Sequence, residues 1–408
     1  MKYYKLQNLC VDIIDCPHST PEWKKEGVRV VRNFNLKNGN IDFSDGYYVD
    51  EETYLNRIKR AIPEAGDIII SREAPMGVVG IVPENLKCCL GQRLVLLKVD
   101  KSKCNPFYLL FMLMSNFVQT QFKRADATGS IVSNLCIPDL KEIIIPMVDS
   151  GQENIAKLLE AINNKMLVNN KINDNLEQQA KLIYDYWFTQ FDFPDENGKP
   201  YCSSGGKMVW NEQLKRNIPE NWNVVPLLKL VSWESNSQPP KSEFVYEPKE
   251  GYVRFIQNRD YDSDTHITYI PRTKNLSIVD RFDILMDKYG DAGAVRYGIE
   301  GAFNVALGKI CVHNPNYREY IRSFLGSDGI YKFLHNSCMA STRASLSEAN
   351  LAILNVVVPD EKIILDYENF LHKIRVSILK NKNETVELIN LRDWLLPMLM
   401  NGQATIAD

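Results

Sequence analysis

The 408-residue chain lacks the features of a secreted or membrane protein. Its longest apolar run, residues 107–114, is far too short to span a bilayer, and no apolar leader follows Met1. Nine cysteines are present, but none shows Cys-x-x-Cys spacing. An odd, unpatterned set of this kind is typical of a reducing compartment. We therefore expect a cytoplasmic protein.

The chain also lacks an excess of positive charge. Its formal net charge is −3, whereas a protein that binds DNA alone usually carries a basic footprint. Local basic loops are still compatible with this balance. A nucleic-acid function would then favour a partner that shares the neutralisation of phosphates.

Catalytic and metal-binding motifs are missing as well. The five histidines are dispersed, and none is paired with cysteine at metal-ligand spacing. Residues 314–317, Asn-Pro-Asn-Tyr, differ by one residue from the Asn-Pro-Pro-Tyr site of amino-methyltransferases. No glycine-rich strand-to-helix turn precedes them to hold S-adenosylmethionine, so we expect a turn here. The sequence predicts no catalytic residue and no metal site.

What the chain does contain is an internal duplication with a period of about half its length. Gly27-Val-Arg-Val-Val-Arg32 is echoed by Gly251-Tyr-Val-Arg-Phe-Ile256. Asp67 with Gly77 is echoed by Asp283 with Gly293, and Leu90-Gly-Gln92 by Leu307-Gly-Lys309. Two similar modules on one chain predict a pseudo-two-fold protein that meets two similar targets.

A long helical pattern follows each module. Ile155, Ile162, Asn169, Leu176 and Ile183 recur every seven residues, and the second copy repeats the series from Tyr367 to Leu395. This spacing predicts two coiled-coil helices, which we expect to pair antiparallel. Each series has an asparagine in third place, Asn169 and Asn381. These are either polar breaks in ordinary helices or residues that set the register of the pair, and the matched positions favour the second interpretation.

The predicted fold class is α+β, with two similar α/β modules separated by two long antiparallel helices. We place the first module at residues 1–150, the central helix at 151–192, a turn-rich connector at 193–221, the second module at 222–360 and the C-terminal helix at 361–408. Strand-like runs and turn signals alternate within both modules.

Several strings together resemble the specificity subunit of type I restriction-modification systems. They include Cys16-Pro-His-Ser-Thr-Pro21, Leu182-Ile-Tyr-Asp-Tyr-Trp-Phe188, Ile218-Pro-Glu-Asn-Trp222 and Leu391-Arg-Asp-Trp-Leu-Leu-Pro397. The resemblance implies a non-catalytic DNA reader with two target recognition domains, each reading half of a bipartite sequence. It also implies modification subunits that use S-adenosylmethionine, and restriction subunits that use ATP and Mg²⁺. The alternatives are a stand-alone S-adenosylmethionine-dependent methyltransferase and a coiled-coil scaffold without DNA specificity.

Candidate DNA contacts are polar residues in loops that follow predicted strands and helices, because such side chains bond base edges and phosphates. In the first module they are His18, Ser19, Arg32, Asn33, Asn35, Lys37, Arg72, Lys123, Arg124 and Ser130. In the second module they are Gln257, Asn258, Arg259, Lys288, Tyr289, Arg296, Arg343 and Ser345. Each residue taken alone is better explained as a solvated surface residue, and only the recurrence of such residues in both modules favours an interface.

Overall fold

The computed structural model describes residues 1–43, 46–73, 75–126, 134–148, 150–261, 266–339, 345–400, 403–404 and 406. The chain divides into two units, residues 1–168 with 384–408, and residues 169–383. Each unit holds one globular module and one stretch of each of two long helices. Helices and short sheets alternate within the modules, which confirms the predicted α+β class.

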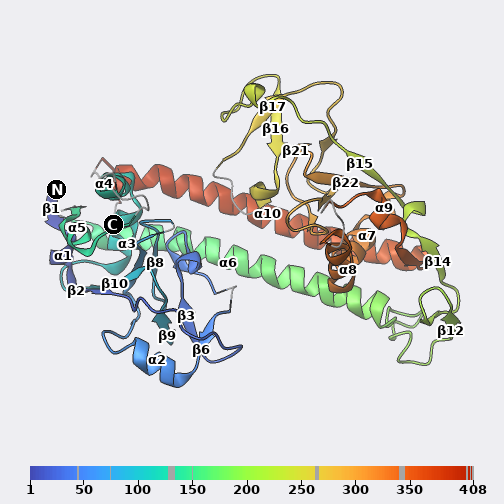
Figure 1. The fold of residues 1–408 in the computed structure, drawn as a ribbon, viewed down its shortest axis with the longest axis horizontal. Helices are drawn as coiled ribbons and strands as arrows, with labels where there is room; N and C mark the ends of the chain where they lie inside the picture. The colour runs from blue at the N-terminus through green and yellow to red at the C-terminus, as the bar shows by residue number, and fades with distance from the viewer. Residues whose placement is uncertain are drawn as a thin grey trace. The chain divides into compact units, whose positions relative to one another are not determined.

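The first module is built on a four-stranded antiparallel sheet (Figure 1). Its strands, in spatial order, are β2 (Cys10–Asp15), β10 (Leu94–Val99), β7 (Ile68–Ser71) and β8 (Val79–Ile81). Every residue of β7 is buried, so the sheet is covered on both faces. Ile68 and Ile70 belong to a core cluster with helix α3 (Pro106–Met114), whereas Ile69 packs with the residues of a second sheet.

This second sheet has the order β6 (Tyr48–Val49), β3 (Val28–Val31) and β9 (Cys88–Leu90). Strands β3 and β9 run parallel, and helix α2 (Glu51–Arg57) contacts β9. The remaining elements of the module are β1 (Lys2–Lys5), α1 (Leu6–Leu9), β4 (Leu36–Lys37), β5 (Asn40–Ile41), α4 (Asn116–Asp126), α5 (Ile137–Glu142) and β11 (Ile144–Met147).

Helix α3 begins at a capped first turn and ends before Ser115. The side chain of Asn105 accepts hydrogen bonds from the backbone N–H groups of Phe107 and Tyr108, at 2.9 and 3.2 Å, and Pro106 fills the first turn. The helical pattern of residues 107–123 favours a single helix, but the structure divides it in two. Ser115 adopts an extended backbone, its hydroxyl donates to the carbonyl of Met112 at 2.6 Å, and α4 starts after it.

The second module repeats this plan. Its larger sheet has the order β15 (Val231–Ser235), β22 (Leu307–Val312), β19 (Ile284–Asp287) and β20 (Val295–Arg296). Its other sheet has the order β17 (Tyr269–Pro271), β16 (Tyr252–Ile256), β21 (Gly301–Phe303) and β18 (Ile278–Val279), with β16 and β21 parallel. Helices α7 (Arg318–Leu325), α8 (Asp328–Met339) and α9 (Glu348–Ala352) follow, and β14 (Asn223–Pro226) pairs with β23 (Asn355–Val358).

Two long helices confirm the heptad prediction. Helix α6 (Gln152–Tyr184) has 33 residues and continues into a π-helical turn, Asp185–Thr189. Helix α10 (Glu361–Met400) has 40 residues. No helix of the described residues is both long and apolar enough to cross a bilayer.

The two helices pair antiparallel within each unit. In the first unit, Ile155 and Leu159 of α6 share a buried cluster with Leu396 and Leu399 of α10, and Lys165 forms an ion pair with Glu384 at 3.2 Å. In the second unit, Asn173 bonds Asn381 and Glu177 pairs with Arg375. Successive residues along α6 therefore contact residues progressively earlier in α10, as two antiparallel helices require.

The connector is more ordered than the sequence predicted. It contains a hairpin of β12 (Met208–Asn211) and β13 (Arg216–Pro219). Phe193 stacks on Trp222 with ring centroids 4.6 Å apart and on Tyr201 at 4.7 Å. The aromatic residues at the end of α6 are therefore mainly core, as Tyr184 and Phe188 are also buried.

Candidate nucleic-acid interface

In the first module, several strand ends meet at one edge of the larger sheet. Strands β2 and β7 end where β10 begins, since Val95 pairs with both Asp15 and Ile70. The parallel strands β3 and β9 end side by side, and β9 leads directly into the start of β10. We call the residues of the loops at these ends the first polar edge: His18, Ser19, Arg32, Arg72, Gln92 and Arg93.

Hydrogen bonds join the loops of the first polar edge. The Nε2 of Gln92 donates to the carbonyl of His18, and the backbone N–H of Arg72 donates to the carbonyl of Arg93 at 2.8 Å. The ring of His18 lies 3.0 Å from a carboxylate oxygen of Asp15. Sequence reasoning missed Gln92 and Arg93. The short interval between β9 and β10 was the signal that could have indicated them.

Arg72 holds this edge together instead of projecting from it. Its Nε donates to the carbonyl of Leu135 at 3.1 Å, and its two terminal nitrogens bond Asp15 at 2.9 Å and Asn134 at 3.3 Å. The side chain is only 13% exposed. Its donors are therefore already used within the module.

Asn33 and Asn35 need a correction, because both side chains are buried. The Asn35 amide donates to the carbonyl of Asp42 at 2.7 Å and its oxygen accepts from the backbone N–H of Arg32 at 2.8 Å. These contacts shape the turn after β3 and leave the two asparagines inside the module. In this conformation neither side chain is available to DNA. Lys37 is exposed and forms an ion pair with Asp42 at 2.8 Å.

Arg32 differs from its neighbours, since its guanidinium lies on aromatic rings. The Cζ is 4.1 Å from the ring centroid of Tyr47 and within 5.5 Å of those of Phe34 and Trp23. Lys123 and Arg124 lie in the last turn of α4, at least partly exposed. Ser130 and Arg343 lie outside the residues that the structure describes.

The second module has an equivalent edge, and matching backbone hydrogen bonds define the equivalence. The N–H of Lys288 donates to the carbonyl of Ala306 at 2.8 Å, as that of Arg72 does to Arg93. The N–H of Leu346 donates to Lys288 at 3.0 Å, as that of Leu135 does to Arg72. Arg72 and Lys288 are therefore equivalent positions, and the sequence placed them correctly.

A second equivalence concerns two turns, the one after β3 in the first module and the one after β16 in the second. The backbone N–H of Arg32 donates to the side chain of Asn35, and that of Gln257 donates to the side chain of Asp260 at 3.1 Å. The backbone N–H of Asn35 donates to the carbonyl of Arg32 at 2.9 Å, and that of Asp260 donates to the carbonyl of Gln257 at the same distance. Arg32 and Gln257 therefore occupy the same backbone position.

Two predicted echoes are wrong in register. Because Arg32 matches Gln257, the echo of residues 27–32 by residues 251–256 is displaced by one residue. The other wrong echo concerns Leu307. Leu307 begins β22 and pairs with Asp287, as Leu94 begins β10 and pairs with Ser71. Leu307 is thus equivalent to Leu94 and not to Leu90. The positive-φ turn glycines Gly77 and Gly293 do match, because their N–H groups bond the equivalent carbonyls of Ser71 and Asp287, both at 2.9 Å.

The side chains of the second edge are arranged differently from those of the first. Gln257 donates to the hydroxyl of Thr268 at 3.1 Å. Tyr289 is exposed, whereas Lys288 is half-buried and its Nζ lies 3.5 Å from the hydroxyl of Ser235. Arg296 pairs with Asp287 at 2.9 Å.

Burial raises the pKa of Asp287, and Arg296 opposes that shift. Asn258 and Ser345 are half-buried, and Arg259 is exposed. The shared backbone therefore presents different chemistry in the two modules.

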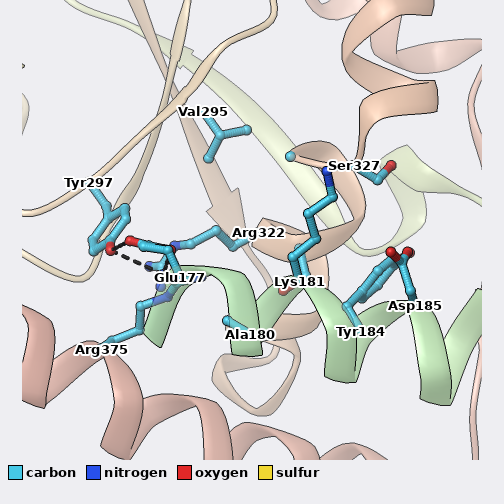
Figure 2. Close-up of a pocket in the computed structure, with 12 residues that line it drawn as sticks. Glu177, Ala180, Lys181, Tyr184, Asp185, Val295, Tyr297, Arg322, Ser327 and Arg375 are labelled. Carbon is cyan, nitrogen blue, oxygen red and sulfur yellow. Dashed lines mark hydrogen bonds and ion pairs between the residues drawn. The ribbon is translucent and has the colours of Figure 1, made fainter. Parts of the chain in front are cut away.

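The second module is joined to the helices by a buried ionic cluster (Figure 2). Arg375 of α10 pairs with Glu177 of α6 and, at 3.0 Å, with Glu319 of α7. Arg322 also bonds Glu319, and Tyr297 bonds Glu177. Burial alone would lower the pKa of Arg375, but Tyr297, Glu177 and Glu319 raise it above its usual value. The cluster fixes helix and module geometry within the second unit.

Of the two predicted register residues, Asn381 bonds a residue of the other long helix and Asn169 is buried. The Nδ2 of Asn381 donates to the Oδ1 of Asn173 at 2.9 Å, so Asn173 is its partner. Asn169 is buried, at 1% exposure. Sequence reasoning missed Asn173, which lies four residues after Asn169 and so shares its face of the helix.

The motif at residues 314–317 has a structural role. Pro315–Tyr317 forms a 3₁₀ turn that leads into α7, and the side chain of Asn314 accepts from the N–H of Asn316 at 3.1 Å. Burial raises the pKa of several cysteines, to about 12 for Cys10 and Cys88, which disfavours a nucleophilic thiolate. Among the described residues, no group of three or more His, Cys, Asp or Glu is placed to hold a metal ion.

Comparison with known proteins agrees with this architecture. The family model described as the type I restriction modification DNA specificity domain matches residues 14–178. The type I restriction enzyme MjaIX specificity subunit of Methanocaldococcus jannaschii is 23% identical over 88% of this chain and 85% of its own. The HindI specificity subunit of Haemophilus influenzae is 21% identical over 85% and 88%.

A solved structure shares the fold. The crystal structure of the S subunit of a type I restriction-modification system from M. genitalium aligns over 97% of this chain and 94% of its own, with a TM-score of 0.57 and 16% identity. The duplicated modules and the paired helices therefore accompany a similarity to type I restriction-modification specificity subunits that extends over most of the chain.

Proposed function

We propose that the chain reads a bipartite DNA sequence and positions a separate adenine methyltransferase on it. Each module reads one half-site through its polar edge, and the paired helices set the gap between the halves. The observation that carries this proposal is the repetition of one backbone edge with different side chains, such as Arg32 in the first module against Gln257 in the second. A shared framework suits two DNA half-sites, and different side chains suit different bases.

The chemistry belongs to partner subunits. Modification subunits would supply S-adenosylmethionine-dependent methylation, and restriction subunits would supply ATP- and Mg²⁺-dependent cleavage. The net charge of −3 supports a partner that contributes part of the phosphate contacts. Joining two modest half-sites on one chain raises affinity through effective concentration.

An exchange of modules tests the proposal. Residues 1–150 would be replaced by the corresponding module of a relative, and the complex with its methyltransferase subunit would be mapped for methylated adenines. We expect one half of the recognised sequence to change and the other half and the gap to stay. A change in both halves would contradict independent reading by the two modules.

A second measurement separates this proposal from a stand-alone methyltransferase. We expect the purified chain alone to show no binding of S-adenosylmethionine by calorimetry, because Asn314 is used in a local turn. Saturable binding by the isolated chain would favour the enzymatic alternative.

A further inference from the structure

The guanidinium of Arg32 is held by three aromatic side chains, Trp23, Phe34 and Tyr47, which we call the aromatic clamp. Its Cζ lies 4.1 Å from the ring centroid of Tyr47, 5.3 Å from that of Phe34 and 5.5 Å from that of Trp23. Trp23 and Tyr47 also pack edge to face, with centroids 4.9 Å apart. Phe34 is 57% exposed and Trp23 is 37% exposed, so these rings do not serve the core.

The clamp orients Arg32 without using its donors. Within the described part of the chain, the Arg32 guanidinium makes no ion pair and no hydrogen bond. In Arg57 and Arg72, by contrast, all three guanidinium nitrogens donate hydrogen bonds to neighbouring residues. A guanidinium stacked on ring faces keeps its N–H groups pointing outward in its own plane. Among the residues that the structure describes, Arg32 is thus a pre-organised bidentate donor whose guanidinium meets no acceptor.

Two acceptors on DNA match such a donor, the O6/N7 edge of guanine and the phosphate group. The equivalent residue of the second module distinguishes them. Gln257 occupies the same backbone position, and glutamine is a bidentate partner for adenine but cannot neutralise a phosphate. A position that carries arginine in one module and glutamine in the other fits base reading.

We infer that Arg32 contacts a guanine edge in the first half-site, and that Trp23, Phe34 and Tyr47 are positioning residues that hold its guanidinium. This inference rests on the proposed function, and it names the base class that one position of the first polar edge reads. Ordering the side chain before binding reduces the entropy lost on contact.

The test uses the full-length chain with its methyltransferase subunit and maps methylated adenines for the wild type, Arg32→Ala and Arg32→Lys. We expect the wild-type first half-site to contain a guanine at which both variants lose discrimination, by about 5- to 150-fold, the range of one bidentate contact. The second half-site should be unchanged. Lysine keeps the charge but not the planar fork, so it should not restore the preference.

Phe34→Leu and Tyr47→Leu test the clamp. We expect both to weaken discrimination at that same guanine and at no other position, which a loss of module stability would not do. The matched control is Lys87→Gln, because Lys87 also lies over a ring, that of Tyr54 at 4.7 Å, but is held by Glu51 at 2.8 Å. This control should leave the motif and the rate unchanged.

Three results would overturn the inference. An unchanged motif with uniformly slower methylation in Arg32→Ala, restored by Arg32→Lys, would assign Arg32 to a phosphate. An unchanged motif and rate in both variants would remove Arg32 from the interface while the proposed function stands. A wild-type complex without a split motif would overturn the proposed function and this inference with it.

Discussion

The Nδ2 of Asn381 in helix α10 donates a 2.9 Å hydrogen bond to the Oδ1 of Asn173 in helix α6. Asn173 also donates to the carbonyl of Ile378 at 3.4 Å, and its side chain is only 7% exposed. A buried polar pair between two helices is satisfied in one alignment only, so it disfavours slipped registers.

Breaking this pair should destabilise the helices. We expect Asn173→Ala and Asn381→Ala each to lower the free energy of unfolding by about 1–3 kcal/mol, because each leaves a poorly solvated amide without its partner. A double-mutant cycle by chemical denaturation should give a coupling of about 1 kcal/mol. Asn383→Ala, which removes an exposed bond to Arg281, is the control and should cost less. Additive single effects at Asn173 and Asn381 would show that the pair does not act as a unit.

The buried cluster around Glu319 should be sensitive to the loss of one partner. Glu319 is fully buried, and Arg375 is 5% exposed. We expect Arg375→Met to destabilise the second unit by about 3–5 kcal/mol, since it removes one of the two cations that compensate the Glu319 carboxylate. Lys181→Met, which removes an exposed ion pair with Asp328, should change stability by less than about 1 kcal/mol. Equal thermal shifts for the two variants would contradict this assignment.

The carboxyl of Glu368 should make stability depend on pH. Burial raises its pKa from 4.5 to about 7, with an added contribution from Glu319 that Arg322 and Arg318 oppose. Below about pH 4.5 the carboxyl is protonated in both states. As the pH rises towards 7, the unfolded state releases its proton first, so the folded state loses stability by about 1–3 kcal/mol.

Comparison of thermal midpoints between pH 5 and pH 8 measures this effect. We expect Glu368→Gln to be more stable than the wild type at pH 8 and to lose that advantage at pH 5. Glu247→Gln, at an exposed glutamate of the same unit, should show no such trend. A pH-independent difference at Glu368 would contradict the assigned titration.

Lengthening both long helices should change the gap in the recognised sequence. An insertion near Tyr184, at the end of α6, is unsuitable because Tyr184 packs against Phe188 in the following turn and against Tyr320 of α7. Seven residues, two turns, would instead be inserted after Val168 in α6 and after Asn383 in α10. About 10 Å of added helix corresponds to about three base pairs of DNA. An unchanged gap would show that the helices do not set it.

Sequence patterns predicted the duplication, the long helices and the mixed composition of the modules, because heptads and alternating apolar runs are local signals. Sequence patterns did not predict which polar side chains are buried in the module or hydrogen-bonded within it. Asn33 and Arg72 look like surface residues in the sequence, but tertiary contacts with Glu73, Leu135 and Asp15 bury or occupy them. The aromatic clamp was missed because Trp23 and Tyr47 lie far from Arg32 in sequence and meet it only in the fold.

The central claim is tested most directly by mapping methylated adenines in DNA from cells that express the chain with its neighbouring methyltransferase subunit. We predict a split motif, two different half-sites separated by a gap of fixed length. A continuous motif, or methylation without sequence preference, would contradict recognition by two modules on paired helices.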